Sequence, residues 1–466
     1  MRSRTVAGWA TISLAASFAL SSTPVAMAQP VVTAELPVDE CKISAQVADL
    51  FNEGFDRGVL AASPTGTLTA QVVFVEFPDL ALGAPGNATL DDVRQGIADT
   101  EARLEGLSEG RLDVVVLEHP DPIMLTKPTT EYPATQKQDF DPRTWASFVA
   151  DAITAAAGSI DFAASDVVWL FFPSAPQLPT RAQADNLVLL PGGNSPVDRA
   201  VTLPMVQQDL RATLVHETGH TFGLPDLYAT SGDLPSGLYV SGWDLMGLAA
   251  GGEFFSWHRW RLGWMDDSHV RCIAPGGGGP DLKIDALTRD GPVLAAVIPT
   301  SDRRVLVVES RRADRYNGPF FSGGVFVYIV SSDVKSGEGP VRIAPKDGTE
   351  PPQFGPDFDE APLAVGERYT DVESSTTITV VASSEWSDTV RIASTADATP
   401  PPTEPGTPAN PAEPADVPAR DSASTLPPTG SDSSPVLALS TGLLVTGVLV
   451  MALGRRRRSQ PPVTRR

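Results

Sequence analysis

The chain has 466 residues, more than one ordinary hydrophobic core needs, so two folded units with accessory segments are expected. Its 35 Lys and Arg against 57 Asp and Glu give a formal net charge of −22, which argues against nucleic acid, whose phosphates demand clustered basic side chains. A hydrophobic content of 42% excludes a wholly disordered chain. Two cysteines exclude a disulfide-dense scaffold and a four-cysteine metal site.

The N-terminus has the pattern of a secretory signal peptide. A basic start at residues 2–4 precedes an apolar run over residues 6–20 and the small-residue site Ala-Met-Ala at residues 26–28. We expect residues 1–28 to be removed; an N-terminal membrane anchor is the alternative, but the apolar run is short for one. Residues 29–65 would then form an N-terminal segment or a short propeptide.

Residues 66–274 are expected to form a mixed α/β domain. Apolar runs in this part of the chain predict buried strands, and two longer segments predict helices. The strands are expected at Leu68–Phe77 and Asp166–Phe172, and the helices at Ala88–Leu107 and Pro142–Ala157.

The motif HETGH occupies residues 216–220, at the end of a helix expected to begin near Pro204. Residues four apart share one face of a helix, so the imidazoles of His216 and His220 can reach one metal ion. Glu217 then lies beside the ion without needing to bind it. The spacing therefore predicts a catalytic metal site.

The residues after the motif supply a third metal ligand. Gly223 can end the helix in a left-handed turn and Pro225 prevents the helix from continuing, so the chain swings back toward the metal. The carboxylate of Asp226 is an acceptable zinc ligand. Two histidines and one carboxylate leave the fourth position open to water, as in catalytic zinc sites. Glu217 would accept the proton of that water and pass it to a leaving amine.

Other residues of this region are candidates for supporting roles. Met246, within the segment WDLMG, could form an apolar floor beneath the zinc. His258 and Tyr228 are candidate transition-state donors, although a solvent-exposed or core position is the alternative for His258. Three tryptophans at helical spacing over residues 257–264 are expected to pack a helix behind the site.

A glycine-rich break at residues 275–280 is expected to separate the first domain from a β-rich, sandwich-like domain at residues 280–395. Strands of this second domain are expected at Val293–Ile298, Arg304–Ser310, Gly324–Val330, Thr376–Ala382 and Thr389–Ile392.

The two cysteines, Cys41 and Cys272, most simply form one disulfide in an exported protein. Such a bond would tie the N-terminal segment to the end of the first domain. A more specific alternative is that Cys41 lies in a short propeptide, where its thiolate binds the zinc and keeps a zymogen inactive. Two free thiols with neither role are the third alternative.

The C-terminal part of the chain lacks the features of a folded domain. Residues 396–429 are rich in proline and predict an extended stalk. Residues 426–466 begin with LPPTG and continue with an apolar run over residues 436–453, long enough for a membrane-spanning helix. Four arginines at residues 455–458 follow the run and are expected to stay cytoplasmic.

This order of elements resembles the sorting signal of Gram-positive surface proteins. The resemblance implies that a sortase cuts between Thr429 and Gly430 and joins Thr429 to peptidoglycan. Contact with the membrane would then be limited to the sorting helix before cleavage. A plain single-pass anchor is the alternative, and both interpretations place the protein outside the cell.

Several segments together resemble the immune inhibitor A family of secreted bacterial zinc metallopeptidases. The resemblance spans roughly residues 66–335 and is most specific at residues 216–228 and 243–247. The segments are HETGHTFGLPDLY, WDLMG, FFSWHRWRLGW, VVFVEFPD, VLVVESRR and GGVFVYIV. It implies an α+β fold, in which a metzincin-like zinc peptidase domain, with a mixed twisted sheet and an active-site helix, precedes the β-rich sandwich-like domain.

The resemblance also implies roles for individual residues. His216, His220 and Asp226 correspond to the zinc ligands, Glu217 to the catalytic base and Met246 to the methionine of the Met-turn. The chain departs from some metzincins because no tyrosine follows Met246, so the oxyanion-stabilising residue is unassigned. The small bacterial neutral proteases share the pattern HExxHxxGxxD, but they are too short to account for the β-rich domain.

Calcium is a second metal that the resemblance implies, because members of the family often bind it. Asp357, Asp359 and Glu360 could contribute ligands, with an acidic solvated loop as the alternative.

These observations favour a secreted zinc metalloendopeptidase, anchored to the wall of a Gram-positive bacterium, with protein or peptide substrates. One alternative is a surface adhesin that uses a peptidase fold without turnover, although a binding protein has no need of Glu217. Another alternative is a hydrolase of the peptides in peptidoglycan.

Overall fold

The structure is a computed structural model that describes most of the chain between residues 35 and 396. The described ranges are 35–45, 50–132, 142–176, 178, 182–186, 188, 190, 195–206, 210–230, 234–235, 237–248, 252–312, 323–353 and 356–396. The predicted signal peptide, the stalk from residue 397 onward and the sorting signal with Thr429 and Gly430 lie outside them. Within the described ranges, no helix has the length and apolar character needed to cross a membrane.

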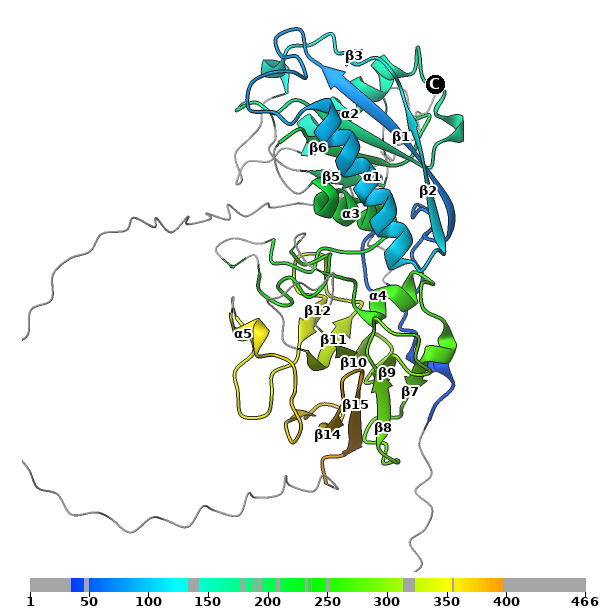
Figure 1. Ribbon diagram of the computed structural model, residues 1–466, viewed down its shortest axis with the longest axis vertical. Coiled ribbons are helices and arrows are strands. Elements are labelled where there is room, and N and C mark those ends of the chain that lie inside the picture. Colours follow the sequence, from blue (N-terminus) through cyan, green and yellow to red (C-terminus); the bar gives the residue numbers. More distant parts are fainter. Residues whose placement is uncertain are drawn as a thin grey trace, which may run out of the picture.

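The first half of the described chain forms a six-stranded sheet with three helices, drawn in the upper part of Figure 1. The strands run in the order β2-β1-β4-β6-β5, and β3 pairs with β1 beyond β2. All are parallel except β5, which is antiparallel to β6. The elements are β1 (Gly66–Glu76), α1 (Leu90–Leu107), β2 (Leu112–Glu118), β3 (Ile123–Met124), α2 (Pro142–Ala156), β4 (Val167–Phe172), β5 (Gln183–Asp185), β6 (Ala200–Pro204) and α3 (Leu210–Thr221).

The two faces of this sheet carry separate apolar cores, because side chains alternate along a strand. On β1, Leu68 and Val72 belong to the core that contains residues of α1 and α3, whereas Val73 and Val75 belong to the core that contains residues of α2. The buried strands near residues 70 and 170 and the two long helices agree with the sequence predictions to within a few residues. The face with α1 and α3 is the one that holds the predicted metal site.

The start of the motif helix differs from the sequence prediction. A helix from near Pro204 was expected, but Pro204 ends β6 and α3 begins at Leu210. Every residue of β6 is buried and the strand pairs with β4. A short apolar run of this kind suits a buried strand as well as a helix, so periodicity alone does not distinguish the two.

The second half of the described chain forms two further sheets, in the lower part of Figure 1. One sheet has the order β12-β11-β10-β9-β7 and the other β13-β14-β15-β8. The elements are α4 (Ser256–Arg261), β7 (Val270–Cys272), β8 (Leu282–Asp285), β9 (Ala295–Pro299), β10 (Arg304–Arg311), β11 (Gly324–Ser331), β12 (Val341–Ile343), α5 (Pro356–Asp359), β13 (Arg368–Asp371), β14 (Thr376–Ser383) and β15 (Ser387–Ser394). Three sheets and few helices agree with the predicted α+β class.

The expected boundary at residues 275–280 does not fully separate the two parts, although the β-rich sheets also have a core of their own that includes Ile284 and Ile378. β7 precedes this break, yet it pairs with β9 in the five-stranded sheet. The core of the motif helix also extends into the β-rich part, where the Trp243 ring lies 4.2 Å from that of Phe326 and the Phe255 ring stacks on that of Tyr328 at 4.3 Å. The part with the six-stranded sheet and the five-stranded sheet therefore share one core.

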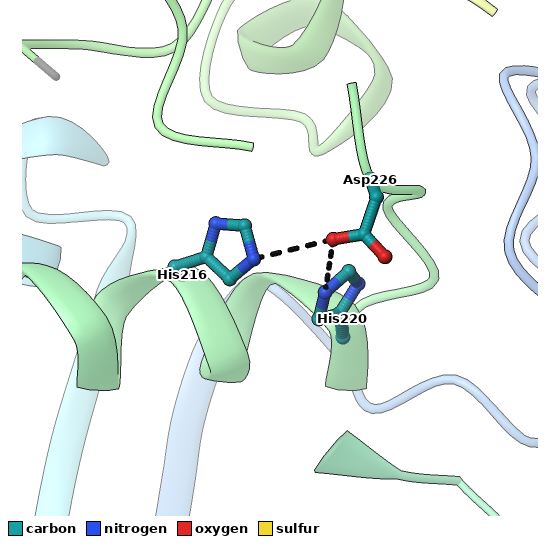
Figure 2. A group of neighbouring side chains, drawn as sticks. All are labelled: His216, His220 and Asp226. Carbon is teal, nitrogen blue, oxygen red and sulfur yellow. Dashed lines mark ion pairs between the residues drawn. The ribbon is translucent and has the colours of Figure 1, made fainter. Parts of the chain in front are cut away.

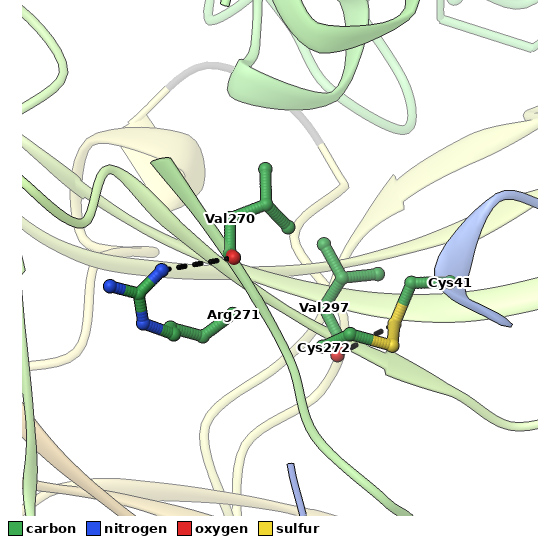
Figure 3. Close-up of a disulfide and its surroundings, with 5 residues drawn as sticks. All are labelled: Cys41, Val270, Arg271, Cys272 and Val297. Atoms are coloured by element: carbon green, nitrogen blue, oxygen red, sulfur yellow. Dashed lines mark hydrogen bonds between the residues drawn. A yellow bond between two sulfur atoms is a disulfide. The ribbon is translucent and has the colours of Figure 1, made fainter. Parts of the chain in front are cut away.

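The N-terminal segment is joined to this core by a disulfide. Cys41, at the end of the short 3₁₀-helix η1 (Val38–Cys41), is bonded to Cys272 in β7 with an S–S distance of 2.14 Å (Figure 3). The two residues are 231 positions apart, and in the chain-entropy model such a loop closure contributes roughly 5 kcal/mol to stability. With Cys41 held in this bond, a thiolate of Cys41 bound to zinc has no place in this structure.

Candidate metal centre

α3 places the two motif histidines on one face of a buried helix. His216, Glu217 and His220 each expose 2% or less of their surface. Gly219 allows Met246 to lie directly against this helix, since a Cβ atom at Gly219 would be 2.7 Å from the Met246 sulfur. Met246 is thus where a Met-turn residue was predicted, beneath the motif.

The chain turns back after α3 as the sequence predicted. α3 ends at Thr221, and Gly223 adopts a φ of +87°, a left-handed conformation that suits glycine. The turn brings Asp226 over the helix, and Figure 2 shows its carboxylate pointing toward both rings. Asp226 Oδ1 lies 3.3 Å from His216 Nε2 and 3.1 Å from His220 Nε2.

The other nitrogen of each ring is held by a backbone carbonyl, which fixes the tautomer. His216 Nδ1 donates to the Leu245 carbonyl at 2.7 Å, and His220 Nδ1 donates to the Leu224 carbonyl at 2.8 Å. A carbonyl oxygen accepts only, so each Nδ1 carries the hydrogen and each neutral ring presents a lone pair at Nε2. Metal-binding histidines are commonly oriented in this way.

These atoms fit a metal ion. Both Nε2 atoms and Asp226 Oδ1 are buried without a hydrogen-bond partner. Ligand bonds of zinc to nitrogen and oxygen are about 2.0–2.2 Å, so two tetrahedral ligands lie about 3.3 Å apart. The three residues form a cluster whose ligand atoms all lie within 4.8 Å of one another. Two lone pairs and a carboxylate at these distances suit a tetrahedral cation such as zinc.

Glu217 lies beside this cluster with both carboxylate oxygens buried and without hydrogen-bond partners. Burial raises the pKa of Glu217 to about 8; His216 opposes this shift, whereas the nearby carboxylates of Asp226 and Asp185 add to it. Without a bound cation, Glu217 therefore holds a proton near neutral pH. A bound cation would favour its charged form.

A loop of the β-rich part holds the third predicted ligand. Ser336, between β11 and β12, accepts a hydrogen bond from the Asp226 backbone N–H at 2.9 Å, and its hydroxyl lies 3.4 Å from Asp226 Oδ2. The Gly337 N–H donates to the Asp226 carbonyl at 2.9 Å. The sequence contains no signal for this contact, which joins residues 110 positions apart.

The two candidate transition-state donors have different surroundings. The Tyr228 ring lies 6.0 Å from that of His216, so Tyr228 stays a prediction as a donor near the metal. Both nitrogens of His258 are engaged instead, Nδ1 with Asp244 and Nε2 with Glu53, each at 3.0 Å. His258 therefore has the core position that the sequence left open, and its ring has no free N–H to offer a substrate.

The remaining predictions near the site concern packing and calcium. Trp257, Trp260 and Trp264 are buried in the core, as expected for side chains that pack a helix behind the site.

The calcium site stays a prediction. Asp359 is the last residue of α5 and Glu360 follows it, but the side chain of Asp357 falls outside the described part of the chain.

Comparisons with known proteins add little. No family model and no curated protein match the chain. Among solved structures, it is similar to metalloproteinase-II from Bacteroides fragilis, with 10% identity and a TM-score of 0.25 over 48% of this chain. The match covers 59% of that protein, less than two thirds of its length. A TM-score this low does not support a conclusion about the fold or the function of the chain.

The contact between Ser336 and Asp226 yields a first prediction. Ser336→Ala removes the hydroxyl that holds the backbone and carboxylate of Asp226, so we expect zinc affinity to fall about tenfold, as for other outer-shell partners of metal ligands. Ser336→Thr, which keeps a hydroxyl, should restore it. Competition with a chromophoric chelator measures the affinity, and Ser384→Ala on the surface is the matched control. An unchanged affinity in Ser336→Ala would contradict this role.

A second prediction concerns His258 and pH. Burial favours the neutral ring, but Asp244 and Glu53 outweigh burial and raise the pKa of His258 to about 10. Its charged form therefore stabilises the fold fully below about pH 6.5, and this contribution is lost as the pH rises toward about 10. His258→Gln should therefore lower the free energy of unfolding more at about pH 6 than at about pH 10. Denaturant titration of the variant and the wild type at both pH values measures this difference. His119→Gln, near the end of β2, is the control, and an equal loss at both pH values would contradict the prediction.

Proposed function

We propose that the chain is a zinc-dependent metalloendopeptidase that hydrolyses peptide bonds in extracellular proteins. One observation carries this proposal. Two histidine Nε2 atoms and the Asp226 carboxylate converge without hydrogen-bond partners, and Glu217 lies beside them with both oxygens also unpartnered. Three ligands and a buried carboxylate are the composition of a hydrolytic zinc site rather than a structural one.

Each residue of the site would have a distinct role. His216 and His220 would bind the ion through their Nε2 atoms, and Asp226 would bind it through a carboxylate oxygen. Zinc bound there supplies Lewis acidity, which polarises a carbonyl and lowers the pKa of water. Glu217 takes the proton released by the attacking water and delivers it to the leaving amine.

The edge of the six-stranded sheet suits a polypeptide substrate. Within the described part of the chain, β5 pairs only with β6 and it contacts α3. An unpaired strand edge presents backbone N–H and C=O groups to which an extended peptide can add.

The decisive test is Glu217→Gln. This change keeps the size of the side chain but removes its ability to take a proton, so cleavage of a peptide library should fall by several orders of magnitude while zinc stays bound. Activity is followed by mass spectrometry and zinc by metal analysis. Glu101→Gln, in α1, is the matched control and should cleave like the wild type. Undiminished cleavage by Glu217→Gln would refute the assignment.

Two further measurements separate the rival functions. A surface adhesin would bind host or matrix protein at equilibrium without cleaving it, however long the incubation. A peptidoglycan hydrolase would release fragments from purified cell wall and leave protein substrates intact. The composition of the site argues against the adhesin, because binding alone has no need of a buried carboxylate beside three metal ligands. It suits a peptidoglycan hydrolase as well as a protein endopeptidase, so the cell-wall measurement decides between these two.

We also propose that the protein is secreted and anchored to the wall of a Gram-positive bacterium. The support is the order of LPPTG, apolar run and basic tail in the sequence. Thr429→Ala should move the protein from the covalently bound wall fraction to the medium or membrane, measured by immunoblotting of fractionated cells. Thr407→Ala in the stalk is the control. Wall attachment that survives Thr429→Ala would contradict sortase anchoring.

A further inference from the structure

The N-terminal segment contributes a charged side chain to the centre of the protein. Glu53 is fully buried, and its carboxylate lies 3.0 and 3.2 Å from His258 Nε2. It also accepts a hydrogen bond from the Trp257 indole at 3.1 Å. On the other side of the ring, His258 Nδ1 contacts Asp244 at 3.0 Å. His258 thus joins two buried carboxylates that are far apart in sequence.

Asp244 in turn fixes the turn that carries Met246. Its Oδ1 accepts the Met246 N–H at 2.7 Å, and its Oδ2 accepts the Phe255 N–H at 2.6 Å in addition to contacting His258. A carboxylate that accepts several such bonds holds the backbone of residues 243–247 in one conformation.

This turn touches two of the three predicted metal ligands. The Leu245 carbonyl, between Asp244 and Met246, accepts from His216 Nδ1 at 2.7 Å. The Met246 carbonyl accepts from the N–H of Leu227, the residue next to Asp226, at 2.8 Å. A shift of the turn would therefore move the His216 ring and the backbone beside Asp226 together.

We propose that Glu53 is a positioning residue of the metal centre, acting through His258 and Asp244 on the turn at residues 243–247. It follows that residues 35–62 are a permanent part of the working protein and not a propeptide that is removed. The inference rests on the proposed metal site, but it concerns residues that do not touch the metal.

Other contacts of the segment support its permanence. The disulfide from Cys41 reaches β7, and Arg261 Nε donates to the Gly54 carbonyl at 2.5 Å. The Ala62 N–H donates to the Thr221 carbonyl, at the end of α3, at 2.7 Å. The Phe51 ring packs edge-on against the His220 ring at 5.4 Å. Loss of the segment would expose these groups and leave His258 without one of its two carboxylates.

The first test compares Glu53→Gln with Glu40→Gln, which alters an exposed carboxylate of the same segment. We expect Glu53→Gln to weaken zinc binding about tenfold and to change the visible spectrum of the Co²⁺-loaded protein, which reports ligand geometry. Glu40→Gln should change neither. A purely structural role would lower the unfolding midpoint of Glu53→Gln but leave affinity and spectrum unchanged, and that result would overturn the proposal.

A double variant tests the route of the effect. If Glu53 acts through His258, adding Glu53→Gln to His258→Gln should weaken zinc binding no further. Additive losses would overturn the route through His258. A wild-type protein that binds neither zinc nor Co²⁺ would instead refute the metal centre itself, so the two failures are distinguishable.

The second test needs no variant and decides the matter even if Glu53→Gln does not fold. The intact mass of the mature, proteolytically active protein is measured after reduction, so that a segment held only by the disulfide is detached. We expect a chain that begins upstream of Cys41. An active chain that begins after Glu53 would overturn the proposal.

Discussion

The metal centre depends on one constraint, the burial of three ligand atoms that have no hydrogen-bond partners. Two ring nitrogens and a carboxylate oxygen are confined within about the spacing of zinc ligands. Without a cation, their lone pairs face one another away from water, which is unfavourable. The fold maintains this arrangement because each side chain is held from behind, His216 by Leu245, His220 by Leu224 and Asp226 by Ser336.

The groups that hold the ligands come from segments distant in sequence. The turn at residues 243–247 supports His216, the loop between β11 and β12 supports Asp226, and the N-terminal segment supports the turn through His258. Two buried carboxylates flank His258, and unpaired charges at these positions would be costly. Each contributing segment is therefore difficult to remove without disturbing the ligands.

Sequence reasoning predicted the parts of the site that are local. His216, His220 and Asp226 follow from helix periodicity and from the turn at Gly223, and the main strands and helices follow from apolar patterning. It did not predict features that depend on contacts between distant segments. These are the pairing of β6, which sets the start of α3, the shared core and the partners of His258. A single glutamate such as Glu53 carries no pattern, and only the fold shows that it meets His258, 205 positions away.

The shared core has a thermodynamic consequence for the two parts of the protein. Phe326 and Tyr328 of the five-stranded sheet pack in the same core as Met246 and α3, so separating the two parts would expose this shared core. A cation that binds only the folded state adds its binding free energy to the stability of that state. Because this core is shared, we expect the stabilisation to extend to the five-stranded sheet as well as to α3. The five-stranded sheet and the loop with Ser336 are thus structurally connected to the candidate metal centre.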